Sequence, residues 1–227
     1  MHPKIRMKVV AFIHAKGSSE RVPSKNLRVL GDRPLFCHAI AIAQNAALVD
    51  EVVIDSDSDE ILAIGKKYGA TPLKRPADLA TNLTTGDDLA YWQASNRPDS
   101  IIVAQVIPTA PFLRSASVDK AIREILASER DSVAGVYSEP MYLWKEGKPA
   151  YFLPDGRIPN SFAMAPVVFE TTGLYVNRTR FVLRHKKRMN PENCLPILLD
   201  KMESIDINTQ DDFSFAQVVW QGLHPPY

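Results

Sequence analysis

The sequence has almost no net charge and no long apolar run. Lys and Arg total 27 against 26 Asp and Glu, which gives a net charge of +1. Binding nucleic acid through a broad basic face needs many uncompensated cations, so we expect no nucleic-acid partner. No apolar stretch approaches the ~18 residues that cross a bilayer, and residues 1–6 lack the apolar segment of a signal peptide. We therefore expect no membrane partner and a cytoplasmic location.

Cysteine is scarce, and no repeat or low-complexity segment is visible. Cys37 and Cys194 lie far apart and form neither a CxxC nor a metal-type spacing, so we expect two buried, reduced thiols. Hydrophobic residues make up 45% of the 227 residues and charged residues 23%, the balance of an ordinary globular protein. This length suits one domain with an appended lobe.

Short apolar runs alternate with helical patterns along the first 140 residues or so. Such alternation predicts an α/β fold with a mainly parallel central sheet and helices on both of its faces. Ligands of such sheets bind beyond the carboxyl ends of the strands. We expect strands at 8–13, 51–54, 100–106 and 132–137, and helices at 34–45, 58–69 and 115–128.

The rhythm changes over residues 139–170, where prolines and glycines predict hairpins and loops instead of strand–helix units. We interpret this segment as an arm inserted into a single domain that spans residues 1–227. A long strand at 167–177 is expected to return to the core. Thr209 is expected to cap a final helix.

The loop after the first strand, residues 15–26, combines one glycine, several serines and the cations Lys16, Arg21 and Lys25. Small residues let backbone N–H groups approach an anion, and the long cationic side chains suit a triphosphate. The loop is neither a Walker loop nor GxGxxG. On charge alone, a solvated basic loop is an equally good interpretation.

Six segments resemble, in family order, the motifs of the acylneuraminate (CMP-sialic acid) cytidylyltransferases. The loop 15–26 is similar to ARGGSKGIPxKN, and residues 30–35 are similar to LGGKPL. The other four segments are 53–61 (VIDSDSDEI), 75–80 (RPADLA), 108–114 (PTAPFLR) and 205–213 (IDINTQDDF). The resemblance covers nearly the whole chain. It implies a Rossmann-like nucleotidyltransferase fold and a homodimer whose arms help to form the partner's sugar site.

The activity implied is transfer of CMP from CTP to the anomeric hydroxyl of a sialic acid-like keto-sugar acid, with release of pyrophosphate and with Mg²⁺ or Mn²⁺ as cofactor. By resemblance, Lys25 and Asp206 are the candidate catalytic residues, and Asp206 and Asn208 correspond to a metal-binding DxD. The candidate nucleotide-binding residues are Ala15, Lys16, Gly17, Ser18, Ser19, Arg21, Lys25, Asn26 and Arg75, and the candidate sugar-binding residues are Gln105, Thr109, Glu170 and Thr172.

Several of these residues have a second interpretation. Arg75 also suits a salt-bridged surface position, and Asp206 also suits the entry of the final helix. Gln105 is as well explained as an amide satisfied at the sheet edge. Of Asp55, Asp57 and Asp59, we expect only Asp57 near the site, because Ser58 and Asp59 begin a helix. His14 is better explained as a satisfied histidine at the edge of the core than as a nucleotide contact.

Departures from the family pattern leave the acceptor open. Lys16 replaces an arginine, Glu20 a lysine, and Asn82 and Asn208 each an aspartate. Ile107 stands where the family has a sugar-contacting glutamine, and Glu170 where sialic-acid enzymes tend to be basic. These differences favour a sugar acid other than plain N-acetylneuraminate. Two alternatives remain: a nucleotidyltransferase that uses another nucleotide or a sugar phosphate, and a degenerate member that binds nucleotide without turnover.

Overall fold

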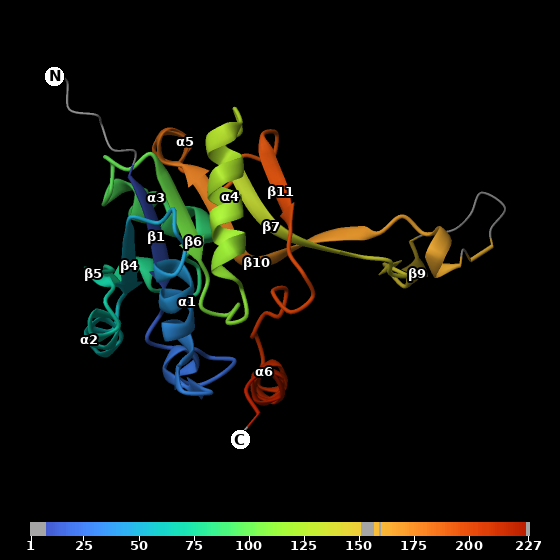
Figure 1. The fold of residues 1–227 in the computed structure, drawn as a ribbon, viewed down its shortest axis with the longest axis horizontal. Coiled ribbons are helices and arrows are strands. Elements are labelled where there is room, and N and C mark those ends of the chain that lie inside the picture. Colours follow the sequence, from blue (N-terminus) through green and yellow to red (C-terminus); the bar gives the residue numbers. More distant parts are fainter. Residues whose placement is uncertain (1–7, 151–156, 159, 226–227) are drawn as a thin grey trace.

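The computed structural model of the protein describes residues 8–150, 157, 158 and 160–225, and its centre is a seven-stranded sheet (Figure 1). β10 (Val167–Arg178) pairs antiparallel with both of its neighbours, and the other recorded pairings in this sheet are parallel. The mainly parallel α/β sheet predicted from the sequence is therefore confirmed. In sheet order the remaining strands are β11 (Cys194–Leu198), β7 (Ser132–Glu139), then β6 (Ile102–Val106), β1 (Val9–His14), β4 (Glu51–Ser56) and β5 (Thr71–Lys74).

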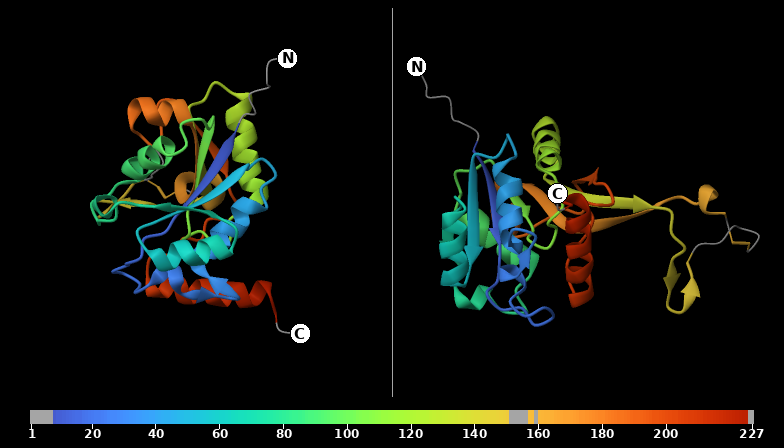
Figure 2. Two further views of the ribbon diagram at one scale, coloured as in Figure 1. Left: turned by 90° about the vertical axis from the view of Figure 1, so that its left-hand side faces the viewer. Right: turned by 60° about the horizontal axis from the view of Figure 1, so that its bottom comes forward.

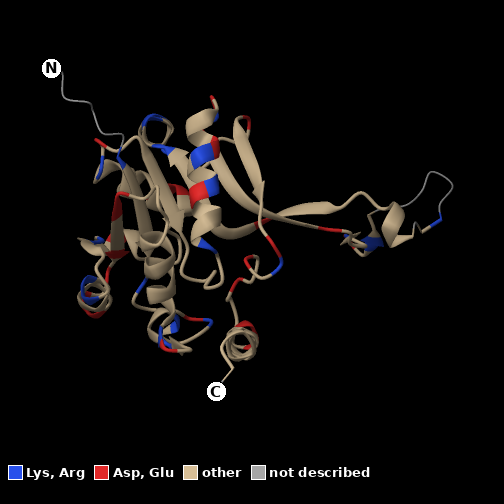
Figure 3. Cartoon of the chain, viewed as in Figure 1, with Lys and Arg blue, Asp and Glu red and all other residues tan. Residues whose placement is uncertain are grey.

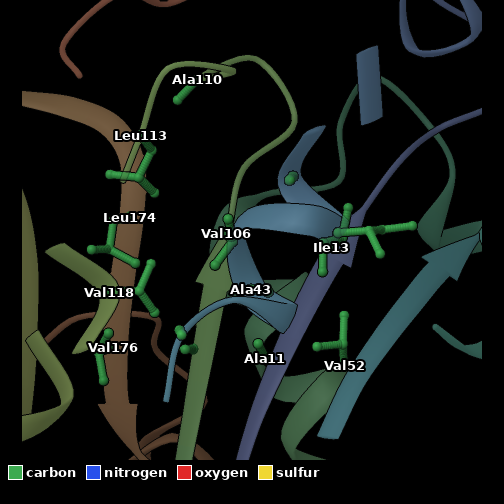
Figure 4. Packing of buried hydrophobic residues seen from close by; sticks show 14 of the residues in the cluster. Ala11, Ile13, Ala43, Val52, Val106, Ala110, Leu113, Val118, Leu174 and Val176 are labelled. Carbon is green, nitrogen blue, oxygen red and sulfur yellow. The ribbon is translucent and has the colours of Figure 1, made fainter. Parts of the chain in front are cut away.

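Helices cover both faces of the sheet (Figures 1 and 2). α1 (Leu35–Gln44), α2 (Asp59–Lys67) and α4 (Ser115–Ala127) pack on one face in the larger core cluster. α3 (Gly86–Ser95) and α5 (Thr179–His185) pack on the other. Alternate residues of one strand enter opposite clusters: Ala11 and Ile13 of β1 meet the first group (Figure 4), whereas Val10 and Phe12 meet the second.

The final helix, α6 (Gln210–Leu223), lies apart from the sheet and is covered by a third, smaller cluster. Thr209 caps it with a full capping box, as the sequence predicted. Phe213 and Ala216 are buried against Leu30 and Leu35 around the short hairpin of β2 (Val29–Leu30) and β3 (Arg33–Pro34). Gly31 has φ +65°, and a Cβ there would lie 2.0 Å from the Trp220 ring, so only glycine permits this packing.

The described residues of the predicted arm, 139–170, project from the main body on an extension of the sheet (Figures 1 and 2). Its base is the outer part of the β7–β10 ribbon, where Val167 pairs with Glu139. Its described part holds the hairpin of β8 (Trp144–Lys145) and β9 (Lys148–Pro149) and the 3₁₀ turn η3 (Ser161–Ala163). Two further 3₁₀ turns, η1 (Lys25–Leu27) and η2 (Ala77–Leu79), lie in the main body.

Sequence patterns did not predict α3, α5, β5 or β11. β5 and β11 are the two edges of the sheet and contain Pro72 and Pro196, a residue that only an edge strand tolerates readily. The prediction of two buried thiols was wrong for Cys194, which is only partly buried at that edge, whereas Cys37 is buried and both thiols are free. Among the described residues, no helix has the length and apolarity needed to span a bilayer.

Candidate active site

A cavity of about 500 Å³ opens where β1 and β6 end, at the carboxyl edge predicted to hold the ligand. The predicted site residues that line it are Lys16, Ser18, Ser19, Arg21, Lys25, Asn26, Arg75 and Thr109. The other lining residues are His14, Glu20, Leu79, Thr81, Asn82, Thr84, Leu89, Ile107 and Pro108. Three segments remote in sequence, 14–26, 75–89 and 107–109, thus form one concavity. Basic and acidic residues are interspersed over the main body of the protein (Figure 3).

The loop 15–26 is fastened to the end of the neighbouring strand. The Gly17 N–H donates to the Asp57 carboxylate at 2.9 Å, and the Asn26 amide donates to the Lys16 carbonyl at 2.9 Å. A Cβ on Gly17 would lie 2.9 Å from the Ser58 Cβ, so the glycine allows this close approach. Asp57 therefore lies beside the loop, while the exposed Asp59 pairs with Lys74. Ala15 and Gly17 shape the loop without lining the cavity.

Lys25 connects the loop to the segment that carries Asp206. Its ammonium donates to the Ile207 carbonyl at 2.8 Å, and it lines the cavity. Burial lowers the pKa of Lys25, Asp206 opposes that shift, and Arg21 adds to it. A partly desolvated ammonium near a second cation is well placed to receive a polyphosphate, because an anion would relieve both penalties.

Three departures from the family pattern, Lys16, Glu20 and Asn82, meet at the cavity wall. The Asn82 side chain accepts a hydrogen bond from the Lys16 ammonium and donates one to the Glu20 carboxylate. Glu20 therefore lowers the net positive charge of the loop. It is connected to Lys16 only through the neutral Asn82 side chain and does not pair with it directly. The sequence singled out all three substitutions, but gave no sign that they touch.

Arg75 is buried instead of lying on the surface. It is 4% exposed, and its guanidinium pairs with Asp55 at 2.9 Å and also donates to the Asp55 carbonyl at 2.8 Å. The other Asp55 oxygen accepts from Gln93 at 2.8 Å. This network holds Arg75 in the cavity wall, so the alternative of a surface salt bridge was wrong.

Gln105 continues the same network and does not reach the cavity. Its amide donates to Gln93 at 2.8 Å, and the residue is 1% exposed. The structure therefore gives no geometric support to Gln105 as a sugar contact, because its side chain is buried against Gln93 of α3. The alternative of an amide satisfied at the sheet edge was also wrong, because β6 is a central strand and the Gln105 Oε1 is buried without a partner in the described structure.

His14 lies in the cavity wall. The sequence favoured a satisfied histidine at the core edge, and this was wrong, because its Nδ1 is buried without a hydrogen-bond partner in the described structure. Burial, followed by the charges of Arg75 and Arg188, lowers the pKa of His14 to about 3. The imidazole is therefore neutral at physiological pH and can give or accept a hydrogen bond without adding charge.

Asp206 and Asn208 lie together, as their spacing predicted. One Asp206 oxygen accepts hydrogen bonds from the Asn208 amide and from the Thr172 hydroxyl, the latter at 3.1 Å, whereas its Oδ1 is buried without a partner. The described residues contain no group of three or more His, Cys, Asp or Glu side chains suited to a metal. A metal ion here would rely on these two residues and on oxygens of the substrates.

Glu170 and Thr172 stand outside the cavity on β10, next to a bulge in its pairing with β7. Thr172 adopts φ +57°, in the left-handed region that a non-glycine residue enters at some cost. Glu170 accepts a hydrogen bond from the Tyr175 hydroxyl at 2.6 Å. Of the two, Thr172 contacts Asp206 directly.

α3, which the sequence patterns did not predict, supplies Leu89 to the cavity and Gln93 to the network below it. One signal was available. Thr85 and Asp88 form a capping box, whose T-x-x-D spacing announces the start of a helix. Arg188 was also missed, because it lies in an irregular segment without a motif.

A family model described as Cytidylyltransferase matches residues 10–145. The chain is 29% identical over 93% of its length, and 95% of the relative's, to a CMP-N,N'-diacetyllegionaminic acid synthase of Legionella pneumophila. It is 25% identical over 96% of its length, and 53% of the relative's, to an N-acylneuraminate cytidylyltransferase of Escherichia coli.

The fold is shared with solved structures. A CMP:2-keto-3-deoxy-manno-octonic acid synthetase complexed with CTP superposes with a TM-score of 0.71 at 15% identity, covering 95% of this chain and 99% of the other. That likeness concerns the fold, whereas the family model spans more than half of the chain and includes the loop 15–26 and the segment around Arg75. The chain therefore belongs to the cytidylyltransferase family.

Proposed function

We propose that the protein transfers CMP from CTP to the anomeric hydroxyl of a nonulosonic or related keto-sugar acid and releases pyrophosphate. The observation that carries this proposal is the 500 Å³ cavity, in which cations from the loop 15–26 and from Arg75 face one space. The named relatives act on acids of this class. We propose this class of acceptor from the similarity of the chain to these relatives alone.

In this reaction the anomeric hydroxyl attacks the α-phosphorus while the bond to the bridging oxygen of the leaving pyrophosphate breaks. Negative charge grows on the leaving group, so cations that hold it more tightly in the transition state accelerate the step. We assign to Lys25 and Arg21 the role of stabilising the negative charge on the leaving pyrophosphate. Arg75 orients the nucleotide from a position fixed by Asp55, and neutral His14 offers a hydrogen bond without weakening the positive field.

The Asp206 and Asn208 pair fits Mg²⁺ or Mn²⁺. The unpartnered Asp206 Oδ1 is a buried oxygen that needs a partner, and an oxygen-only donor set completed by phosphate oxygens is typical of Mg²⁺ sites. Rotation of the Asn208 amide would offer its oxygen beside Asp206. Such an ion would neutralise phosphate charge during the transfer.

Replacing Asp206 with asparagine is expected to lower pyrophosphate release on the order of 100-fold at fixed Mg²⁺, because a bound metal contributes several kcal/mol to stabilising the transition state. Asn208→Asp is expected to act in the opposite direction and to lower the Mg²⁺ concentration for half-maximal rate. The measurement is rate against Mg²⁺ concentration. Asp211→Asn, an exposed carboxylate one turn away, is the control. Equal Mg²⁺ dependence in all four proteins would remove Asp206 from the metal site.

We further propose that the arm mediates a homodimer in the cytoplasm, where CTP is available. Large apolar side chains are exposed on it, including Trp144 at 69%, Ile158 at 67% and Phe162 at 99%. Tyr142, Leu143, Trp144, Pro149 and Ile158 line a second cavity of about 310 Å³ there. An exposed apolar surface of this kind suits burial against a second copy.

Thermal unfolding with CTP, UTP, ATP or GTP, each with Mg²⁺, tests the nucleotide first. A ligand at ~100 times its dissociation constant adds about 2.7 kcal/mol, which should raise the midpoint of a domain of this size by roughly 5–10 °C. We expect this shift with CTP alone. Pyrophosphate release is then measured with N,N'-diacetyllegionaminic acid, N-acetylneuraminic acid and 2-keto-3-deoxy-manno-octonic acid.

Each other outcome has a definite meaning. A shift with a different nucleotide would favour a nucleotidyltransferase of other base preference. A shift with CTP but no release with any acceptor, sugar phosphates included, would favour a member that binds nucleotide without turnover. No shift with any nucleotide would contradict the proposal.

A further inference from the structure

The guanidinium of Arg188 lies near the candidate active site, but it has no role in the function proposed above. Its centre lies 4.0 Å from the centroid of the Tyr175 ring. A Cβ added to Gly86 would lie 2.4 Å from its Nη1, so the guanidinium rests on the first turn of α3. The backbone N–H of Arg188 donates a hydrogen bond to the Asp87 carboxylate at 2.8 Å, which fixes the backbone at this residue. The segment after α5 therefore holds this side chain against α3, a helix that packs beside α5.

The positive charge of Arg188 is not compensated by a recorded ion pair. Within residues 8–150, 157, 158 and 160–225, no carboxylate forms a salt bridge with the guanidinium. It rests against the first turn of α3, whose N-terminus is already capped by Thr85 and Asp88 and whose Asp87 accepts from the Arg188 backbone N–H. An arriving carboxylate would therefore pair with the guanidinium itself.

The neighbours of Arg188 place it between the two halves of the site. Gly86, on which it rests, lies between Thr84 and Leu89 of the cavity wall. Its charge acts on His14, also in that wall, and on Tyr175. Tyr175 in turn donates to Glu170 and feels the charge of Asp206. Arg188 does not line the cavity itself, but it connects Gly86, beside the cavity wall, with Tyr175, which binds Glu170.

The chemistry of a keto-sugar acid demands a cation at such a place. Its anomeric carbon carries both the attacking hydroxyl and the carboxylate, so the carboxylate must lie close to the α-phosphate of the nucleotide. Glu170, where sialic-acid enzymes tend to be basic, would repel it. A guanidinium binds a carboxylate through two parallel hydrogen bonds, which fixes orientation as well as charge.

Resting on the function proposed above, we propose that Arg188 binds the carboxylate of the acceptor and makes the site selective for sugar acids over neutral sugars. Arg188 then supplies the positive charge that Glu170, held by the Tyr175 hydroxyl, cannot supply. Glu170 is left to face uncharged N–H groups of the acceptor.

The test compares Arg188→Met and Arg188→Lys with wild type, and Lys187→Met is the control from an exposed neighbour in the same segment. Acceptors are N,N'-diacetyllegionaminic acid, N-acetylneuraminic acid and the methyl ester of each, which removes only the charge. For Arg188→Met we expect KM for the acid to rise about 100-fold, the range of a lost charge-assisted contact, with KM for CTP unchanged. The preference of kcat/KM for acid over ester should fall to near one.

A merely structural role would lower activity on acid and ester alike, so an unchanged preference overturns the proposal. Arg188→Lys should keep part of the preference, because it keeps the charge and loses the paired hydrogen bonds. The thermal shift with CTP must persist in Arg188→Met, which shows that the nucleotide site is still folded.

Calorimetric titration of each acid into the protein with a non-hydrolysable CTP analogue separates the two proposals. If wild type binds an acid without releasing pyrophosphate from CTP, the proposed function fails, and loss of that binding in Arg188→Met still supports Arg188. If wild type turns over and the variant keeps its preference, Arg188 alone is wrong. If wild type neither binds nor converts any acid, both proposals are overturned.

Discussion

Replacing Lys25 with alanine is expected to lower the rate of CMP transfer by about 10²–10³-fold, the usual cost of removing one preorganised group that stabilises developing charge. The ammonium lines the cavity, and burial lowers its pKa, so it meets the pyrophosphate in a poorly screened setting. It also ties the loop 15–26 to the Ile207 carbonyl. The measurement is steady-state pyrophosphate release with saturating acceptor.

Two further variants of the protein are needed to interpret the result. Lys25→Arg keeps the charge but changes the donor geometry, so we expect an intermediate rate. Lys67→Ala removes an exposed lysine from the end of α2 and should leave the rate unchanged. The unfolding midpoint without ligand shows whether the tie to Ile207 matters for folding. A normal rate in Lys25→Ala at saturating CTP would remove Lys25 from the phosphate-binding residues.

Replacing Asp55 with alanine is expected to destabilise the fold by about 3–5 kcal/mol, because it leaves the Arg75 cation buried without its partner. The two side chains are 0% and 3% exposed, and the carboxylate also accepts from Gln93. At this size such a loss lowers the unfolding midpoint by roughly 10 °C. Chemical denaturation monitored by fluorescence measures the change directly.

The matched control lies four residues further along the chain. Asp59 pairs with Lys74 at 2.6 Å, but both side chains are exposed, so Asp59→Ala should change stability little. A double replacement, Asp55→Leu with Arg75→Met, should recover part of the stability and lose CTP binding. A small effect of Asp55→Ala alone would mean that water reaches Arg75 and that its position in the cavity wall is not fixed by the pair.

The sequence anticipated most of the framework because local patterns report burial. Ser58 caps α2 and Thr209 caps α6, as their residue types and spacing indicated. The long return strand, expected at 167–177, is β10, and the hairpin of β8 and β9 lies in the segment where proline and glycine predicted hairpins and loops. β5 and β11 were not predicted, because an edge strand has neither the apolar run nor the strict alternation of a central strand.

Within the site, the sequence could identify segments but not partners. The loop 15–26 and Arg75 were predicted together on the same ligand, and they line one cavity. Gln105 was assigned to the ligand from its strand face, yet α3 covers that face and Gln93 binds the amide instead. The T-x-x-D capping box at Thr85 was a local signal for α3, but which face of the sheet this helix covers depends on its packing.

By itself, the sequence determined the alternation of strands and helices, the carboxyl edge that holds the cavity, and the motifs that identify the family. Only the tertiary structure decided which polar groups meet. It joined Asn82 to Lys16 and Glu20, buried Arg75 on Asp55, and laid Arg188 on Gly86 beside Tyr175. The physical reason is that burial patterns repeat over a few residues and can be read locally. Hydrogen bonds and charge pairs between distant segments depend instead on how the crossover helices pack.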